Sequence, residues 1–71
     1  MATDVHISDA YITLGQLLKK LDLVSTGGQV KFFLAETAII VNGEAENRRG
    51  KKLWPGDQVH IEGHGAVQIT N

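Results

Sequence analysis

The sequence predicts an α+β fold in which two short N-terminal helices pack on a small, mostly antiparallel sheet. Apolar residues recur at helical spacing in two stretches of the first half, about residues 14–22 and 27–36. From residue 39 onward the pattern changes to short β-branched and alternating runs separated by turn residues. The 71 residues suffice for a single domain, 1–71, and contain no cysteine, which excludes disulfides and thiolate metal sites.

The first two elements expected are a short strand and a helix. Polar and apolar residues alternate from Asp4 to Ile7, which indicates a strand. Thr13 and Gln16 form a capping-box pattern, so the first helix should begin directly after Thr13. Its apolar stripe consists of four leucines at i, i+3, i+4 and i+7: Leu14, Leu17, Leu18 and Leu21.

A second capping pattern, Thr26 with Gln29, predicts a second helix over about 27–36. Its apolar face is expected to consist of Val30, Phe33 and Leu34. Two glycines, Gly27-Gly28, occupy its first turn, where each costs about 1 kcal/mol relative to alanine. This cost indicates that the two glycines serve a purpose other than helix stability.

The second half of the sequence predicts β-hairpins. Ile39–Val41 is a β-branched run, and Asn42-Gly43 behind it is a strong signal for a tight hairpin turn. Trp54–Asp57, WPGD, has proline and glycine at the central positions of a type II turn. The remaining expected elements are a strand over 58–62, a turn at 63–65, and a last strand that includes Val67 and Ile69.

The positive charge of the chain is concentrated in its middle. All seven Lys and Arg residues fall between Lys19 and Lys52, a span with only four acids, so it carries three excess positive charges. Four of the seven lie in residues 47–52, NRRGKK, which we call the basic loop. Gly50 is expected to allow backbone angles that turn both basic pairs toward one surface. Such a cluster suits a polyanion, although many charged loops are merely solvated.

The order of these motifs resembles the S4 RNA-binding domain over about residues 12–61. The pieces STGG, VNGE, RRGKKL and PGD together are similar to the small stand-alone bacterial S4 proteins of the YaaA/YbcJ type. The resemblance implies an S4-like (alpha-L) fold and binding of structured RNA, namely ribosomal RNA or a ribosomal precursor. Gly27-Gly28 stands where the broad S4 pattern often has Ser-Arg, whereas Lys31 keeps the second basic position. The RNA contacts of ribosomal S4 domains therefore cannot be transferred unchanged.

We expect an RNA-binding surface that recognises phosphates and shape. Gly28 would let a phosphate approach the start of the second helix, with Lys31 completing the site; alternatively, Gly28 only permits a tight turn between helices. The eight residues of the expected surface are Lys19, Lys20, Gly28, Lys31, Arg48, Arg49, Lys51 and Lys52.

Two aromatic residues leave alternatives open. Phe32 falls opposite the apolar face of its helix and could stack on RNA, but packing against the sheet edge or beneath the basic loop is the favoured expectation. Trp54 could also stack, yet it is expected rather to cover the small core. Neither residue is assigned to the RNA-binding surface.

Other functional classes are disfavoured. His60-x-Glu62-x-His64 resembles a chelating pattern, but the adjacent glycines interrupt the alternation and a fourth ligand is missing, so we expect no metal and no cofactor. Ser8 and Ser25 lack the surroundings of a nucleophile and Asp57 suits the turn, so no enzyme is expected. The first residues, MATDVHISD, do not form a signal peptide, and the absence of cysteine suits a reducing, cytoplasmic setting without membrane contact. The resemblance implies a bacterial protein, and we expect it to be a monomer.

Two rival classes share parts of this pattern. Ubiquitin-like sulfur carriers also have a VNG hairpin and a late GD, but they need a C-terminal Gly-Gly, and this chain ends QITN. A protein-docking module could use the same basic loop on an acidic partner. Competition by added RNA would separate that module from an RNA-binding protein.

Overall fold

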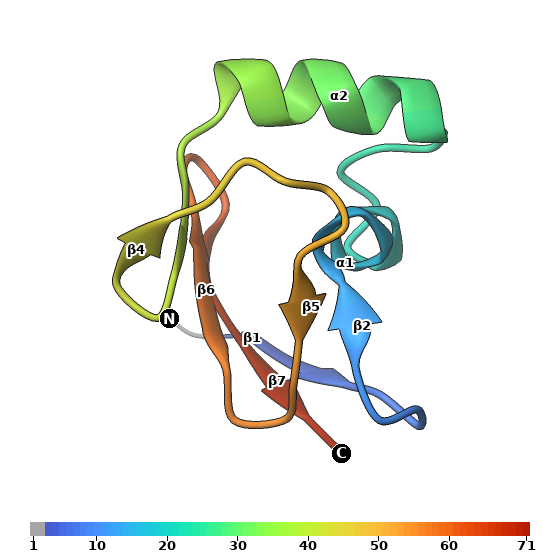
Figure 1. Cartoon of the computed structure of the whole chain (residues 1–71), viewed down its shortest axis with the longest axis vertical. Helices are drawn as coiled ribbons and strands as arrows, with labels where there is room; N and C mark the ends of the chain where they lie inside the picture. The colour runs from blue at the N-terminus through green and yellow to red at the C-terminus, as the bar shows by residue number, and fades with distance from the viewer. Residues whose placement is uncertain (1–2) are drawn as a thin grey trace.

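A computed structural model describes residues 3–71. Two helices follow two short strands, and five further strands complete the chain (Figure 1). In chain order the elements are β1 (Thr3–His6), β2 (Ile12–Thr13), α1 (Leu14–Lys20), α2 (Gly27–Glu36), β3 (Ile39–Val41), β4 (Glu44–Ala45), β5 (Lys52–Leu53), β6 (Gln58–Ile61) and β7 (Gly65–Thr70).

The main sheet has five strands in the order β1-β7-β6-β3-β4. β1 pairs with β7 in parallel, whereas the other three pairings are antiparallel. A second, two-stranded sheet joins β2 and β5, with Ile12 opposite Leu53. The expected α+β arrangement of two helices on a mostly antiparallel sheet is confirmed, although the sequence did not indicate β2, β5 or the parallel pairing.

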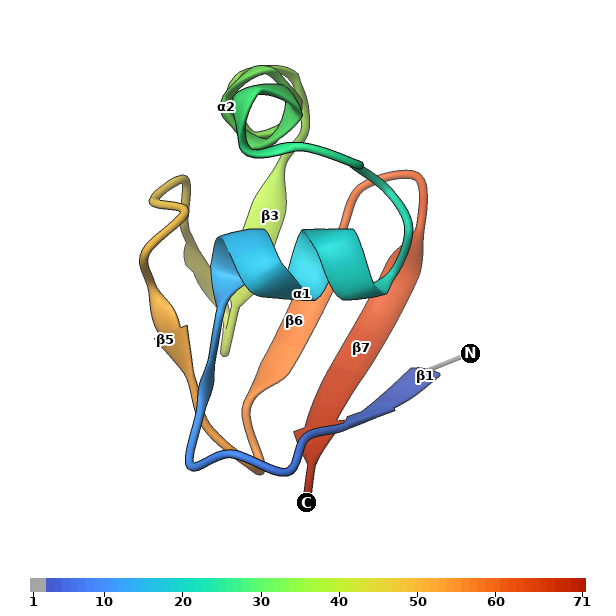
Figure 2. The same ribbon diagram turned by 90° about the vertical axis from the view of Figure 1, so that its right-hand side faces the viewer.

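The core lies between α1 and one face of the main sheet, with α1 crossing in front of the strands in Figure 2. Leu14, Leu17 and Leu18 of α1 are completely buried. Alternate residues of β6 and β7 meet them from the sheet, because side chains on a strand face opposite sides in turn. These sheet residues are Val59, Ile61, Val67 and Ile69.

Both helices begin where the capping patterns predict. Thr13 and Gln16 exchange both bonds of a capping box at the start of α1. The Thr26 hydroxyl accepts the Gln29 backbone amide at 3.3 Å. The Gln29 side chain, however, accepts the backbone amide of Ser25 and not that of Thr26. α1 ends two residues earlier than expected, because Asp22 turns the chain with a φ of 63°. Within residues 3–71, neither helix is long and apolar enough to cross a bilayer.

The two predicted turns both form and are linked to each other. Asn42 and Gly43 have φ angles of 50° and 86°, as a type I′ hairpin turn requires. Gly56 has a φ of 98° in the second turn, which the Asp57 amide closes onto the Trp54 carbonyl. The Asn42 side chain donates to Asp57 Oδ1 at 3.0 Å, so one hydrogen bond joins the VNG and PGD motifs.

Candidate nucleic-acid interface

The basic loop is held against the start of α1 by backbone hydrogen bonds. The Leu14 amide donates to the Lys51 carbonyl and the Gly15 amide to the Arg49 carbonyl, each at 2.9 Å. The first amides of a helix have no partner within the helix, so these loop carbonyls satisfy them. In Figure 1 the loop runs from β4 beneath α2 to α1. The cations therefore extend from a fixed backbone.

Gly15 makes this close approach possible. A Cβ at this position would lie 3.4 Å from the Arg49 carbonyl oxygen and 3.5 Å from the Arg49 Cβ. Gly15 is not among the residues that the sequence predicts for the RNA-binding surface. Glycine lowers the propensity of a segment to form a helix. Its presence among the leucines of α1 could therefore have indicated that Gly15 has a packing role.

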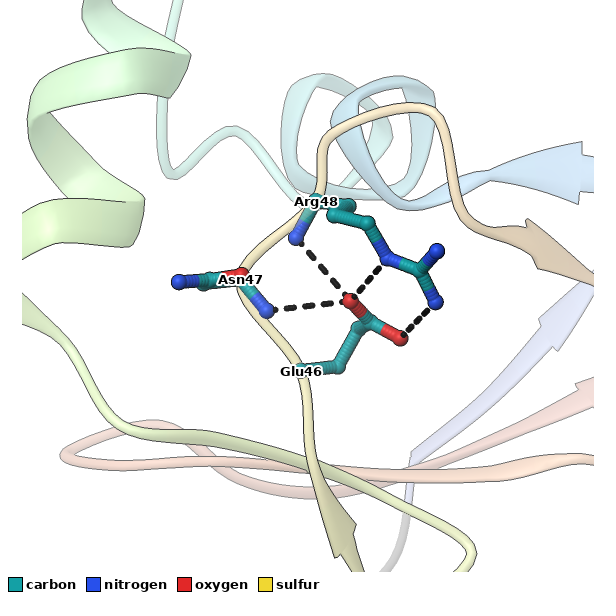
Figure 3. A network of polar contacts seen from close by, with 3 residues as sticks. All are labelled: Glu46, Asn47 and Arg48. Carbon is teal, nitrogen blue, oxygen red and sulfur yellow. Dashed lines mark hydrogen bonds and ion pairs between the residues drawn. The ribbon is translucent and has the colours of Figure 1, made fainter.

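Glu46 organises the beginning of the basic loop (Figure 3). Its carboxylate accepts the backbone amides of Asn47 and Arg48, and it pairs with the Arg48 guanidinium at 2.9 Å. The hydrogen bond from the Arg48 side chain is the main reason that the pKa of Glu46 falls from 4.5 to about 2. The carboxylate thus stays ionised at physiological pH, and Arg48 is the one loop cation with an ion-pair partner among the described residues.

Two hollows lie between the basic loop and the helices, and Arg49 lines both. The first hollow lies beside α2 and is lined by Lys31, Leu34, Ala35, Asn47 and Arg49. The second hollow lies where the helices and the loop meet, and it includes Lys19, Gly27, Arg49 and Gly50. Arg49 thus lies between Lys31 on one side and Lys19 on the other.

The N-terminus of α2 is open. A Cβ at Gly28 would find only the Thr26 hydroxyl, at 3.9 Å, and one at Gly27 would find no atom within 4 Å. The alternative in which Gly28 merely avoids a clash between helices is therefore wrong. In the described part of the chain the Gly27 and Gly28 amides also donate to no protein acceptor.

Two comparisons with known proteins bear on this chain. The family model described as the S4 domain matches residues 5–70. The chain belongs to the S4 domain family. It is 49% identical over 71 residues to a Bacillus subtilis (strain 168) protein named "Probable ribosome maturation protein RlbA", a match that covers 100% of both chains.

The remaining predicted residues of this S4 domain spread over neighbouring surfaces. Arg48, Lys51 and Lys52 line a third hollow together with Gly50 and Trp54. Lys20 faces a different hollow, which it shares with Tyr11 and the segment before β2. Arg49 therefore shares one hollow with Lys31 and another with Lys19, whereas Lys20 lines a hollow without either of the other two lysines or Arg49.

Gly50 does not have the role expected for it. Its φ is not in the left-handed region, where Gly43, Gly56, Gly63 and Gly65 are found. A Cβ at Gly50 would instead project into open space, with no atom within 4 Å. Gly50 lines both the second and the third hollow, so the two hollows adjoin at this residue.

The packing expected for Phe32 is also wrong. Phe32 is 72% exposed, because the apolar face of α2 is completed by Val30, Leu34 and the half-buried Phe33. Trp54 directly follows β5, whose last residue Leu53 fills a core position, and it is itself 47% exposed. Among residues 3–71 no group of three His, Asp or Glu side chains could hold a metal ion.

Proposed function

We propose that this S4 protein binds structured RNA during ribosome maturation, with ribosomal RNA or its precursor as the ligand and without catalysis. The observation that carries the proposal is the position of Arg49, which lines two adjoining hollows with Lys31 in one and Lys19 in the other. Neighbouring cations between two helices and a loop can neutralise successive phosphates of one RNA strand, which isolated surface charges cannot do.

The fixed backbone of the basic loop supports this function. Hydrogen bonds to α1 and to Glu46 restrain the loop before any ligand arrives. Less conformational entropy is then lost on binding than with a free loop. Because the deep groove of A-form RNA hides its base edges, recognition would depend on phosphate positions and helix shape.

The name of the Bacillus relative supports the biological setting. That protein is called a probable ribosome maturation protein, and it aligns with this chain from end to end. The proposed surface contains the eight residues predicted from the sequence, with Lys20 at its margin because it faces another hollow. We propose that the protein acts in the bacterial cytoplasm as a monomer.

Salt dependence tests the proposal. Affinity for a hairpin RNA should fall steeply with salt, with a log–log slope of roughly −3 to −5 for four to six neutralised phosphates. The measurement is a filter-binding titration at several salt concentrations, with a DNA hairpin of the same sequence as control. A flat salt response would exclude phosphate binding, and equal affinity for the DNA would exclude recognition of the A-form shape.

Gly28→Ala should stabilise the fold and weaken RNA binding. The new methyl meets no obstacle in the protein, and alanine favours the helix by up to about 1 kcal/mol. The same methyl would occupy the space of a phosphate at the Gly27 and Gly28 amides. Thermal melts and RNA titrations measure the two effects. Normal RNA affinity in a stabilised variant would eliminate the phosphate site.

Lys31→Ala provides the second part of that test. If Gly28 and Lys31 serve the same phosphate, the double variant should lose less RNA-binding free energy than the sum of the losses in Gly28→Ala and Lys31→Ala. Strictly additive losses would mean that Lys31 contacts a different phosphate, as its place in the first hollow would allow.

Glu46→Gln should increase RNA affinity. The amide oxygen of glutamine can still accept the Asn47 and Arg48 backbone amides, whereas the charge that neutralises Arg48 disappears. The salt slope should steepen by about 0.7–0.9 if Arg48 then contacts one more phosphate. Glu46→Ala is the control, because it removes the acceptor as well. Weaker binding by Glu46→Gln would show that the ion pair itself shapes the surface.

A further inference from the structure

The third hollow combines a rigid exposed aromatic ring with positive charge. Trp54 is 47% exposed and Tyr11 is 37% exposed, and their ring centroids lie 5.1 Å apart with the planes tilted by 48°. The Lys52 ammonium lies 4.9 Å from the Tyr11 centroid, so it covers a face of that ring. The indole of Trp54 borders the hollow that Arg48, Lys51 and Lys52 also line.

The turn that begins at Trp54 fixes the backbone from which the indole extends. The Trp54 amide donates to Asp57 Oδ2 at 2.8 Å, and the Trp54 carbonyl accepts the Asp57 amide at 2.9 Å. The Gly56 amide donates to the Ile69 carbonyl of β7 at 2.8 Å, which joins the turn to the sheet. An aromatic ring on such an anchored turn loses little freedom when a flat ligand stacks on it.

We propose that Trp54 stacks on an unpaired base of the bound RNA, while Lys51 and Lys52 contact the phosphates beside that nucleotide. Every base has a π-face, so stacking with flanking cations is the usual way in which proteins hold unpaired nucleotides. The cations favour a nucleotide over an uncharged peptide. The stacking site rests on the proposed RNA binding and adds a structural preference to it, namely a helix interrupted by an unpaired nucleotide.

The stacking site adjoins the phosphate surface at Gly50. Gly50 lines both the second hollow, with Arg49 and Lys19, and the third hollow, with Trp54. An RNA strand lying over Gly50 would have paired nucleotides at the second hollow and the unpaired one at Trp54. The RNA ligand is therefore a stem with a bulge or a helix–loop junction.

The test compares two hairpin RNAs that differ only in one unpaired uridine within the stem. The wild-type protein should prefer the bulged RNA, and Trp54→Ala should lose about 5- to 150-fold affinity for it while binding the fully paired RNA as before. Trp54→Phe should keep much of the preference because it keeps a ring. Trp54 is the sole tryptophan of the chain, so quenching of its emission by the bulged RNA reports stacking directly.

Matched controls separate the possible outcomes. Phe32→Ala removes another exposed ring, whose hollow contains no cation, and should leave the preference intact. Equal wild-type affinity for the two RNAs, or a preference that survives Trp54→Ala or is lost in Phe32→Ala, would overturn the stacking site alone. Emission quenched by a proline-rich peptide but not by RNA would reassign Trp54 to protein docking. Failure of the wild-type protein to bind either RNA would instead overturn the proposed function.

Discussion

Leu17→Ala should lower the free energy of unfolding by about 2–5 kcal/mol. Leu17 is completely buried between α1 and the sheet, so alanine leaves a cavity that neighbouring side chains can only partly fill. A chain of 71 residues has a total stability of roughly 4–11 kcal/mol at the usual value per residue. One substitution could thus remove a large part of the stability.

Urea denaturation followed by circular dichroism measures this loss, and Leu21→Ala is its matched control. Leu21 belongs to the same leucine stripe but is only partly buried at the C-cap of α1. Its truncation should therefore cost clearly less. Equal losses for the two variants would mean that burial at the sheet is not what makes Leu17 important.

Arg49→Ala should have the largest effect on RNA binding and almost none on stability. Arg49 is exposed, and it contributes to the docking of the basic loop through its carbonyl, which alanine retains. Loss of its charged hydrogen bonds to phosphate should reduce affinity about 10- to 100-fold. The salt slope should decrease in magnitude by about 0.7–0.9.

Arg48→Ala is the control for Arg49, since both arginines belong to the basic loop. Arg48 is already paired with Glu46, so its removal should cost less affinity than that of Arg49. Thermal melts and salt titrations on the two variants provide the comparison. A larger loss for Arg48, or unfolding of Arg49→Ala, would show that the proposed surface is centred on the wrong residue.

The local elements were predictable because their signals lie within a few residues of one another. Thr13 with Gln16 specifies the start of α1, since the partners of a capping box are three residues apart. Asn42-Gly43 specifies the first hairpin turn because few residue pairs tolerate two positive φ angles. Pro55 and Gly56 specify the second turn for a similar reason.

The sequence predicts which charged residues belong to the candidate site, but it does not predict how they are positioned relative to one another. The concentration of cations between Lys19 and Lys52 is visible in the sequence, and so is the glycine pair in the first turn of α2. That Arg49 lies between Lys19 and Lys31, whereas Arg48 is neutralised by Glu46, depends on how the loop folds. Periodicity carries no information about such loop contacts.

The sequence by itself determined the two helices, the two turns, the membership of the leucine stripe in the core and the basic character of the middle of the chain. Only the tertiary structure decided which cations converge, because Gly15 must meet Arg49 across more than thirty intervening residues before the loop has a fixed position. It also decided that Trp54 is exposed, whereas its neighbour Leu53 fills a core position. Local sequence patterns indicate which residues can form a helix or a turn. Which residues lie together on one surface depends instead on packing between segments that are distant in the sequence.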